Sequence, residues 1–524
     1  MVIMPTRKEA LQSHEKVSVV LIYPPVVKPG EPPAGIARLA GALRSNAVSC
    51  AVIDANVEGM YALLEKCEPP GDTWSRRAYR HCEDHLQALR TPFTYTQPER
   101  YQRAVADIGR LLTLSGRADQ IRVGLGDYGD LQWTPVRSTD LRQAARQPER
   151  NPFFNYYQER LLPRIGALQP SVVGLSINYL SQALCAFALI GLLKKAYPGL
   201  KIMAGGGLIT SWLRRPGRCA GFGDLIDHMV AGPGEAALLA AVGAAASDSF
   251  CCPDYSDVRN VAYLSPGFVL PFSASDGCWW RRCAFCPERA ERRPFHPLPH
   301  HTATGHLRHL VAQTQPVLVH LLDNALSPAL LKALAVEPPG AAWYGFVRIG
   351  KPLDDLDFCR RLAAAGCVML KVGLESGSQS VLDALEKGLR LDMAEKVLDN
   401  LRMAGIASYV YLLFGTPAED AAAAHKTLDF VVAHQELIGF LNMAVFNLPL
   451  DSPDAAELQS RDFYQGDLAL YRDFEHPAGW GRIQVRRYLD RTFKRHPAIQ
   501  RIVRRDPPVF TSNHAPFFTP AVLK

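Results

Sequence analysis

Three cysteines lie within nine residues of one another, in the segment SDGCWWRRCAFCPE. Four residues separate Cys278 from Cys283, and two separate Cys283 from Cys286. Thiolates this close together in a loop can all turn toward one metal centre, and soft sulfur ligands suit zinc or iron–sulfur clusters. The spacing therefore predicts a metal site in this loop.

Two kinds of metal site are compatible with three cysteines. A structural zinc ion needs four protein ligands, and His296, His300 or His301 could supply the fourth. A [4Fe–4S] cluster can instead be held by the three cysteines alone, which leaves one iron open to an exogenous ligand and makes the cluster catalytic. Unligated buried cysteines are the third alternative. Three cysteines at this density rarely occur by chance, which argues against unligated thiols, and ligand-type preferences lead us to expect the cluster over zinc.

The chain around this loop has the alternating strand and helix pattern of an α/β fold. Helical patterns such as Asp354–Ala365 and Met393–Ala404 separate six candidate strands. These strands are Phe268–Phe272, Val317–Leu322, Trp343–Val347, Val368–Leu374, Ser408–Phe414 and Phe440–Val445. Six strand–helix units are too few for a closed eight-stranded barrel, so we expect an open partial (β/α)6 TIM-type barrel over residues 266–448. The three cysteines directly follow its first strand.

Three cysteines after the first strand of a partial barrel resemble the radical S-adenosylmethionine (SAM) superfamily. The usual family motif is C-x3-C-x2-C, and this chain has one residue more in the first gap. Phe285, the aromatic residue before the last cysteine, also matches the family pattern. The resemblance implies a [4Fe–4S] cluster on the three cysteines, SAM at the open iron, and Phe285 near the adenine.

Later segments resemble the same family, and each lies at the end of a predicted strand. They are LLDNALS, WYGFVRIG, VGLESGSQ and LLFGTPAED. Any one of them alone could be an ordinary strand-to-helix turn, but they occur in the family's order. The resemblance implies that the SAM-binding residues include Asp323, Asn324, Arg348, Glu375, Ser376, Gly415 and Pro417.

The first half of the chain has a second strand and helix series. Its candidate strands are Val17–Tyr23, Cys50–Ile53, Val172–Ile177, Leu200–Ala204 and His228–Val230. They predict a doubly wound, Rossmann-like α/β domain over residues 1–250. Residues of about 70–165 are rich in Arg, Gln, Tyr and Asp, and we expect a helical insertion there. Residues 449–524 are polar and Arg-rich, and we expect a C-terminal helical region and tail.

The loops that end these strands resemble cobalamin-binding domains fused to radical SAM barrels. Glycines at strand ends let the backbone approach a flat macrocycle, and a helix N-terminus can hold an anionic group. The implied cobalamin-binding residues are Pro24, Pro25, Glu31, Pro32, Pro33, Ser176, Asn178, Gly205, Gly206, Gly207, Gly232, Gly234 and Glu235. The chain has no D-x-H-x-x-G motif, so the resemblance implies cobalamin without a histidine on cobalt. A generic nucleotide-binding sheet is the alternative.

The overall composition limits the classes of function. The chain has 524 residues, 48% of them hydrophobic and 21% charged, which excludes general disorder and suffices for several domains. A net charge of +7 is too mild to predict a nucleic-acid partner. No apolar run reaches about 18 residues and the first residues lack a signal-peptide core, so we expect no membrane partner and a cytoplasmic enzyme.

The resemblance implies a cobalamin-dependent radical SAM enzyme, and we expect a C-methyltransferase. A 5′-deoxyadenosyl radical would activate an unactivated carbon of a peptide or small-molecule substrate, and methylcobalamin would donate the methyl group. The electron would come from a donor such as flavodoxin or ferredoxin. The same cofactors could serve a rearrangement, cyclisation or oxidation, and a cobalamin or iron–sulfur sensor without turnover is a further alternative. No residue is assignable as a catalytic acid or base.

Two tryptophans and one histidine have more than one possible role. Trp279 and Trp280, inside the cysteine segment, could shield the cluster, touch the cobalamin domain or simply pack. His514, in the terminal segment TSNHAPFF, could fold back to the active site or belong to a packed tail.

Overall fold

The computed structural model describes residues 16–68, 71–116, 120–245, 250–463, 465–507 and 514–519. Two compact units make up the chain. The N-terminal unit contains the described residues up to Gly267 together with Gln465–Ala469. The C-terminal unit contains the described residues of 268–463, 470–507 and 514–519.

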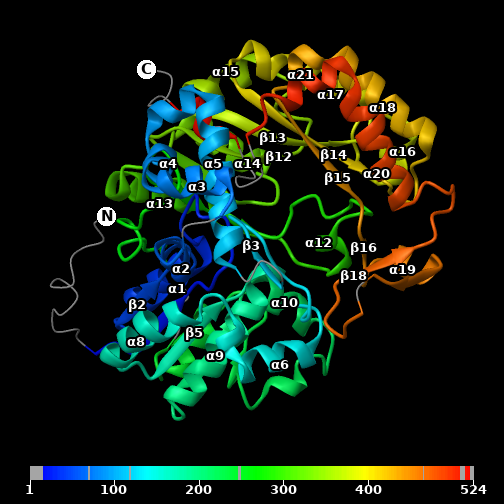
Figure 1. Cartoon of the computed structure of the whole chain (residues 1–524). Coiled ribbons are helices and arrows are strands. Elements are labelled where there is room, and N and C mark those ends of the chain that lie inside the picture. Colours follow the sequence, from blue (N-terminus) through cyan, green and yellow to red (C-terminus); the bar gives the residue numbers. More distant parts are fainter. Residues whose placement is uncertain are drawn as a thin grey trace. The chain divides into compact units, whose positions relative to one another are not determined.

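The N-terminal unit, coloured mostly from blue to green in Figure 1, is built on a five-stranded parallel sheet. Its strands are β1 (Val19–Ile22), β2 (Cys50–Ile53), β5 (Val172–Ser176), β6 (Lys201–Gly205) and β7 (His228–Met229). β1 and β5 are buried along their whole length, as parallel strands covered on both faces must be. The spatial order β2-β1-β5-β6-β7 reverses between β1 and β5, which is where open α/β sheets bind ligands. The predicted doubly wound fold is confirmed.

Helices connect these strands. They are α1 (Ala34–Ser45), α2 (Ala55–Glu65), α9 (Leu180–Ala196), α10 (Gly207–Leu213) and α11 (Glu235–Ala241). α2 begins at a capped end, because the Asp54 side chain accepts a hydrogen bond of 3.1 Å from the Val57 amide. The same carboxylate accepts a hydrogen bond from the Tyr263 hydroxyl, which fixes the end of β2 against the linker that follows the sheet.

Between α2 and β5 the chain adds helices and one short hairpin. The helices are α3 (Thr73–Arg80), α4 (Cys82–Leu89), α5 (Pro98–Ser115), α6 (Ser138–Arg146), α7 (Phe154–Tyr156) and α8 (Leu162–Leu168), with single turns η2 (Pro92–Thr96), η3 (Pro148–Arg150) and η4 (Tyr157–Leu161). The hairpin, β3 (Ile121–Val123) with β4 (Tyr128–Asp130), is a feature that the sequence did not predict. Buried Asp107 of α5 joins the first helices, because it accepts from Trp74 of α3 and pairs with His85 of α4 at 3.0 Å.

The C-terminal unit is built on six parallel strands, each paired with the next along the chain. They are β8 (Val269–Phe272), β11 (Leu318–Leu321), β12 (Trp343–Val347), β13 (Cys367–Glu375), β14 (Ala407–Phe414) and β15 (Phe440–Val445). β8 and β15 are the two edges, so the sheet is an open partial barrel. All six lie where the sequence predicted strands, and the partial barrel is confirmed.

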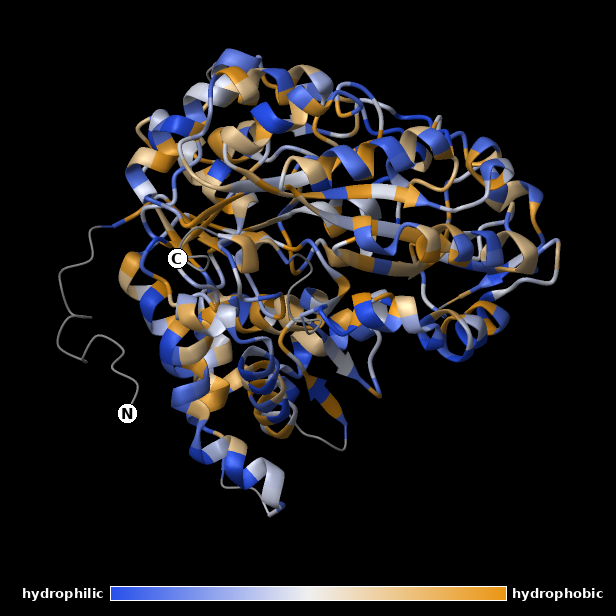
Figure 2. Cartoon of the chain, turned by 90° about the horizontal axis from the view of Figure 1, so that it is seen from above, coloured by the Kyte–Doolittle hydropathy of each residue, from blue (hydrophilic) through white to orange (hydrophobic). Residues whose placement is uncertain are grey.

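Helices follow the strands of this barrel. They are α12 (Pro287–Ala290), α13 (His300–Thr314), α14 (Pro328–Val336), α15 (Leu356–Ala364), α16 (Gln379–Ala384), α17 (Leu391–Met403) and α18 (Ala421–Ala433), with the single turn η6 (Gln435–Leu437). Ser327, Asp355 and Asp420 cap α14, α15 and α18 by accepting backbone hydrogen bonds. Hydrophilic and hydrophobic residues mix along the helices of the chain, as in helices with one buried face (Figure 2).

The region after the barrel is only partly helical. A small antiparallel sheet comes first, with β16 (Leu448–Pro449), β17 (Ser460–Asp462) and β18 (Tyr471–Phe474), and α19 (Asp454–Glu457) lies between its strands. Then come α20 (Arg482–Arg491), η7 (Phe493–Arg495), α21 (Pro497–Val503) and η8 (Ala515–Phe518). The helices were predicted, and the sheet was not. None of the described helices is long and apolar enough to cross a membrane.

The end of the chain packs against the base of the barrel. His514 is 3% exposed and stacks on Tyr409, near the start of β14, with ring centroids 4.4 Å apart. Its ring centroid also lies 4.5 Å from that of Phe440, the first residue of β15. His514 therefore belongs to a packed tail at the N-terminal ends of the strands, opposite the ends that carry the predicted SAM site.

Helices α6 and α9 pack closely against each other in the N-terminal unit, and this packing can be tested by mutation (Figure 1). A Cβ added at Gly191 of α9 would lie 1.9 Å from the Ala145 carbonyl oxygen of α6. Gly191→Ala should therefore lower the free energy of unfolding by about 1–3 kcal/mol, although Gly→Ala in a helix is otherwise favourable. Urea unfolding followed by circular dichroism measures the change. Gly199→Ala, where an added Cβ meets nothing within 4 Å, is the control, and equal stability of the two variants would contradict the packing argument.

Candidate functional site

The three predicted metal-ligating cysteines lie in the loop between β8 and α12. This loop starts with the short strand β9 (Ser275–Asp276), which pairs with β10 (His296–Pro297). Cys278, Cys283 and Cys286 are all half-buried, and Cys286 directly precedes α12. Burial raises the pKa of the Cys286 thiol to about 11 and also raises that of Cys283. A thiolate in this loop therefore needs a metal or a cation to stabilise it.

The donor set of the loop is chemically suited to an iron–sulfur cluster. Among the described residues, no three His, Cys, Asp or Glu side chains are close enough together to hold one metal ion. His296, His300 and His301 of the alternative zinc site are all exposed. In a [4Fe–4S] cluster each thiolate binds a different iron, so its ligands do not need to converge on one point. Three thiols in one loop beside cationic groups match the ligands that such a cluster takes.

The turn after α16, residues 385–388, holds the cysteine loop in place. The Ala284 amide donates to the Leu385 carbonyl at 2.9 Å, and the Trp280 indole donates to the Glu386 carbonyl at 3.3 Å. The Trp280 ring also covers Gly388, where a Cβ would lie 2.3 Å from the ring. Gly388 has a φ of +61°, so glycine meets both requirements of this position. We call residues 385–388 the docking turn.

Arg348, which follows β12, lies between the cysteine loop and the docking turn. Its guanidinium donates to the Cys283 sulfur at 3.7 Å and to the Lys387 carbonyl. It also lies 3.8 Å from the Trp280 ring centroid and 5.8 Å from that of Trp279. Burial lowers the pKa of Arg348, and the neighbouring cysteines oppose that shift. The two tryptophans thus pack around a cation that faces a predicted cluster ligand.

A buried ion pair ends strand β13. Lys387 of the docking turn lies 2.7 Å from the Glu375 carboxylate, and the two side chains are only 6% and 9% exposed. Glu375 has a φ of +67°, at a bulge in the pairing of β13 with β14. A Cβ at Gly373 would lie within 2.7 Å of both charged groups, so the pair fills the space above that glycine. Lys387 is a site residue that the sequence analysis missed.

Asp323 and Asn324, after β11, have different environments. Asp323 is 3% exposed and accepts hydrogen bonds from the Ser275 hydroxyl at 2.5 Å and the Ala274 amide at 3.1 Å. Burial raises the pKa of Asp323 to about 6. Asn324 is exposed. In this structure Asp323 therefore ties the end of β11 to the start of the cysteine loop, and Asn324 is the one that faces outward.

Ser376 is engaged inside the protein. It is fully buried, and its hydroxyl lies 3.2 Å from the Thr427 hydroxyl of α18 and accepts from the Ser378 amide at 3.1 Å. At Gly377 an added Cβ would lie 2.7 Å from the backbone of α18. These contacts fix α18 against the end of β13. Glu375, and not Ser376, is therefore the residue of this segment that pairs with the Lys387 cation of the docking turn.

The loop after β14 is shaped by a residue that the sequence analysis did not select. Gly415 has a φ of +77°, and its amide donates to the Glu419 carboxylate at 2.5 Å. The Trp480 indole donates to the same oxygen at 3.1 Å. The other oxygen of Glu419 is buried and has no hydrogen-bond partner among the described residues. Burial raises the pKa of Glu419 to about 7. Pro417, two residues after Gly415, is half-buried.

The remaining predicted SAM-site residue is Phe285, which is half-buried. Its ring packs against Val381, Leu385 and Ala423. The Lys387 ammonium lies 5.7 Å from the ring centroid. The structure therefore brings Phe285, the cysteine loop and the Glu375–Lys387 pair together at the carboxyl ends of the strands.

In the N-terminal unit, the ends of β5 and β6 are joined by one side chain. The Asn178 amide oxygen accepts from the Gly207 amide at 2.9 Å, and its nitrogen donates to the Ser176 hydroxyl at 3.0 Å. Gly206 has a φ of +104°, and a Cβ there would lie 2.6 Å from the Ile177 carbonyl oxygen. The glycine run is therefore required by the close approach of these two strand ends.

Two further polar residues extend this network, and the sequence analysis missed both. The Gln182 side chain, which is fully buried, donates to the Pro24 carbonyl at 2.8 Å and accepts from the backbone amide of Asn178 at 2.8 Å. Thr210 donates to the Gly206 carbonyl at 2.8 Å and accepts from the Gly232 amide at 2.9 Å. Together they link the loops after β1, β5, β6 and β7.

The predicted cobalamin residues differ in how accessible they are. Pro24, Pro25, Pro32, Pro33 and Ser176 are buried, Glu31, Asn178, Gly205, Gly206, Gly207, Gly234 and Glu235 are half-buried, and Gly232 is exposed. Glu235 pairs with Arg38 of α1. Tyr179, which the sequence analysis did not select, is 55% exposed beside Asn178. The buried prolines thus shape the loop after β1. The accessible surface at these strand ends comes from the glycines and their polar neighbours.

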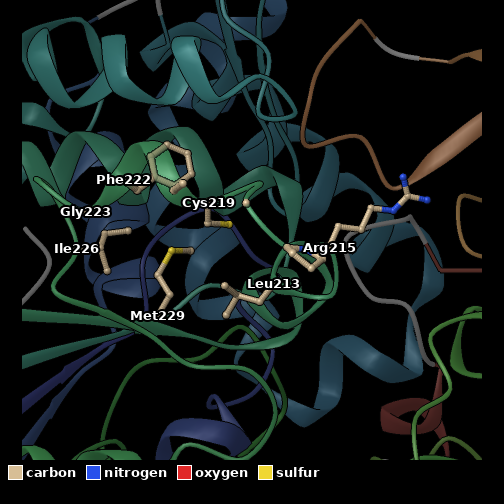
Figure 3. Close-up of a pocket in the computed structure, with 10 residues that line it drawn as sticks. Leu213, Arg215, Cys219, Phe222, Gly223, Ile226 and Met229 are labelled. Atoms are coloured by element: carbon tan, nitrogen blue, oxygen red, sulfur yellow. The ribbon is translucent and has the colours of Figure 1, made fainter.

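A pocket of 370 Å³ lies elsewhere in this unit, between the end of α10 and β7. In Figure 3, Leu213, Cys219, Phe222, Ile226 and Met229 surround it, and the Arg215 guanidinium extends away from them. None of the predicted cofactor residues lines this pocket.

Solved structures with cobalamin and a cluster share this architecture. The radical S-adenosylmethionine methyltransferase TsrM from Kitasatospora setae, with cobalamin and a [4Fe–4S] cluster bound, aligns with a TM-score of 0.52 and 17% identity over 86% of this chain and 81% of its own. TsrM with tryptophan and a SAM analogue gives the same score and identity, over 86% and 79%. The chain has the fold of these enzymes. The cobalamin-dependent radical enzyme OxsB, with aqua-cobalamin and SAM bound, has a TM-score of 0.50 at 13% identity, over 82% of this chain and 53% of its own.

No family model matches the sequence, and a search of curated proteins gives no significant match.

The buried pair at the end of β13 predicts a large loss of stability when one partner is removed. Lys387→Met leaves the Glu375 carboxylate buried without its cation, which should lower the free energy of unfolding by about 3–5 kcal/mol. The double variant Lys387→Met with Glu375→Gln removes both charges and should recover part of this loss. Urea unfolding of the single and double variants measures the effect. A loss of stability in the double variant equal to the sum of the losses in Lys387→Met and Glu375→Gln alone would contradict a coupled pair.

The buried Glu419 predicts a stability that falls as pH rises. Its pKa is about 7 in the folded chain against 4.5 ordinarily, so folding favours the protonated form. That contribution, up to about 3 kcal/mol, is complete below pH 4.5 and is lost as pH rises through 7. Glu419→Gln keeps an acceptor for Gly415 and Trp480 but cannot titrate. Its stability should therefore fall less than that of the wild type between pH 5 and pH 8, as measured by urea unfolding. Other buried acids, such as Asp323, cancel in this comparison, and parallel pH curves would contradict the assignment.

Proposed function

We propose that this protein is a cobalamin-dependent radical SAM enzyme that methylates an unactivated carbon of a peptide or small-molecule substrate. The observation that carries the proposal is the loop of three thiols at the carboxyl end of the first strand of a six-stranded partial barrel. The likeness in fold to TsrM and OxsB, which bind cobalamin, supports it. We further propose that the protein works in the cytoplasm.

Cys278, Cys283 and Cys286 would hold a [4Fe–4S] cluster. With SAM at its open iron such a cluster supplies a 5′-deoxyadenosyl radical, and methylcobalamin supplies the methyl group. The cations of Arg348 and Lys387, which act on the Cys283 thiol, would offset the negative charge of the thiolates. The docking turn contacts the loop through Ala284 and Trp280, and these contacts would position the ligands before the cluster binds.

The strand ends of the barrel would hold SAM. Phe285, Arg348 and the Glu375–Lys387 pair surround the cysteine loop and offer an aromatic face and charges of both signs. The Gly415 loop would contact the adenine, since its backbone is free of a side chain at a φ of +77°. Asn324 is exposed and could reach the methionine part. Asp323 and Ser376 would act indirectly, through the elements that they tie together.

Cobalamin would bind at the carboxyl edge of the N-terminal sheet. The order of strands reverses between β1 and β5, and ligands of open α/β sheets bind at this position. The linked loops with Asn178, the glycines 205–207 and Gly232 provide backbone that a flat macrocycle can approach. Because the chain has no D-x-H-x-x-G motif, no histidine is proposed as a cobalt ligand.

The proposal predicts how the reconstituted protein behaves. Anaerobic reconstitution should give iron and labile sulfide with the ultraviolet–visible spectrum of a [4Fe–4S] cluster, and Cys278→Ala, Cys283→Ala and Cys286→Ala should each lose most of the iron. Cys359→Ala, at a buried thiol far along the sequence, is the matched control and should keep it. Zinc without sulfide in the wild type would overturn the cluster.

The reaction itself is tested with SAM that carries a deuterated methyl group. The wild type reduced with dithionite should form 5′-deoxyadenosine, and with cobalamin and a substrate it should form a product with the labelled methyl group. Deoxyadenosine without methylated product would favour a rearrangement, cyclisation or oxidation. No cleavage of SAM at all would favour a sensor.

A further inference from the structure

The cysteine loop has more arginines than form ion pairs in the described chain. The segment Cys278–Arg293 has five arginines and two glutamates. Two of the arginines are paired, Arg289 with Glu386 at 2.8 Å and Arg293 with Glu288 and Glu291. The other three, Arg281, Arg282 and Arg292, are exposed. Within the described chain none of these three forms an ion pair with a carboxylate.

Two of these exposed arginines lie next to a predicted cluster ligand. Arg281 and Arg282 directly precede Cys283 in the sequence, and Cys283 is half-buried. The Arg282 guanidinium lies 5.1 Å from the Trp280 ring, and Arg348, which donates to the Cys283 sulfur, lies 3.8 Å from the same ring. A short series of contacts therefore runs from the exposed cations to the thiol.

We infer that Arg281, Arg282 and Arg292 form a docking surface for an acidic one-electron carrier protein. This inference rests on the proposed function, because a chain with a redox cluster must receive electrons from outside. The reduced carrier would lose one electron and the oxidised cluster would gain one. Exposed charges of one sign steer a partner of opposite charge and raise its rate of association, and their position beside the cluster keeps the transfer distance short. We call Arg281, Arg282 and Arg292 the arginine surface.

The charge reversal Arg281→Glu with Arg282→Glu tests the arginine surface, with reduced flavodoxin as the probe. Formation of 5′-deoxyadenosine from SAM is measured with flavodoxin at several concentrations, and separately with dithionite, a small reductant that needs no docking. The variant should lose about tenfold in kcat/KM for flavodoxin and stay within about twofold of the wild type with dithionite. Raising the salt concentration should slow the flavodoxin reaction of the wild type more than that of the variant.

Two further variants separate docking from damage to the loop. Arg486→Glu with Arg487→Glu makes the same charge change on the exposed face of α20 and should leave the flavodoxin reaction unchanged. Arg292→Glu lies outside the three-cysteine segment and should lower kcat/KM for flavodoxin about threefold with full iron content. Iron and sulfide analysis of every variant confirms that the cluster is intact.

Several outcomes would overturn the inference. The first is an unchanged kcat/KM for flavodoxin in both variants of the arginine surface. The second is an equal loss of kcat/KM in the α20 control. The third is an equal loss of rate when dithionite is the reductant. Loss of binding to a labelled single-stranded oligonucleotide, with the flavodoxin reaction unchanged, would assign the surface to nucleic acid instead. A wild type that does not cleave SAM even with dithionite would instead refute the proposed function.

Discussion

The buried ion pair between Glu375 and Lys387 connects the elements of the candidate barrel site. Glu375 ends the central strand β13, and Lys387 belongs to the docking turn, which also holds the cysteine loop through Ala284 and Trp280. Burying two charges is costly unless each satisfies the other, so the strand end and the turn must stay together. The cysteine loop, which has little secondary structure of its own, therefore takes its position from a strand that is buried in the sheet.

In the N-terminal unit, neutral side chains hold the candidate loops in position by hydrogen bonds. Its candidate surface consists of loops that end four different strands, and Asn178, Gln182 and Thr210 tie these loops to one another by hydrogen bonds. Such bonds avoid the desolvation cost of charges, and the Gly206 backbone lets two strand ends approach closely. A set of linked loops of this kind presents backbone atoms to a ligand without large rearrangement, which lowers the entropic cost of binding.

The strands could be predicted from sequence because each is a short, buried, apolar run, and the cysteine loop because its spacing is local. Lys387 could not, because its partner lies 12 residues away and the contact forms only when the chain folds back after α16. Glu419 lies within the segment LLFGTPAED, but its contact with Trp480 spans 61 residues. Asp323 stays a predicted SAM-binding residue, and its hydrogen bond to Ser275 is a contact 48 residues apart that the sequence does not indicate. Tertiary contacts of single side chains leave no periodic signal.

The region after the barrel contributes to the site more directly than its sequence suggests. Trp480 bonds to Glu419, and His476 approaches the Thr416 carbonyl at 2.8 Å, so two side chains from this region hold the loop after β14. Tyr488 of α20 bonds to the Ala424 carbonyl of α18, which begins just after that loop. The loop's shape therefore depends on residues some 60 positions later in the chain. If this loop contacts the adenine, as proposed, then sequence changes in the C-terminal region act on SAM binding without touching SAM.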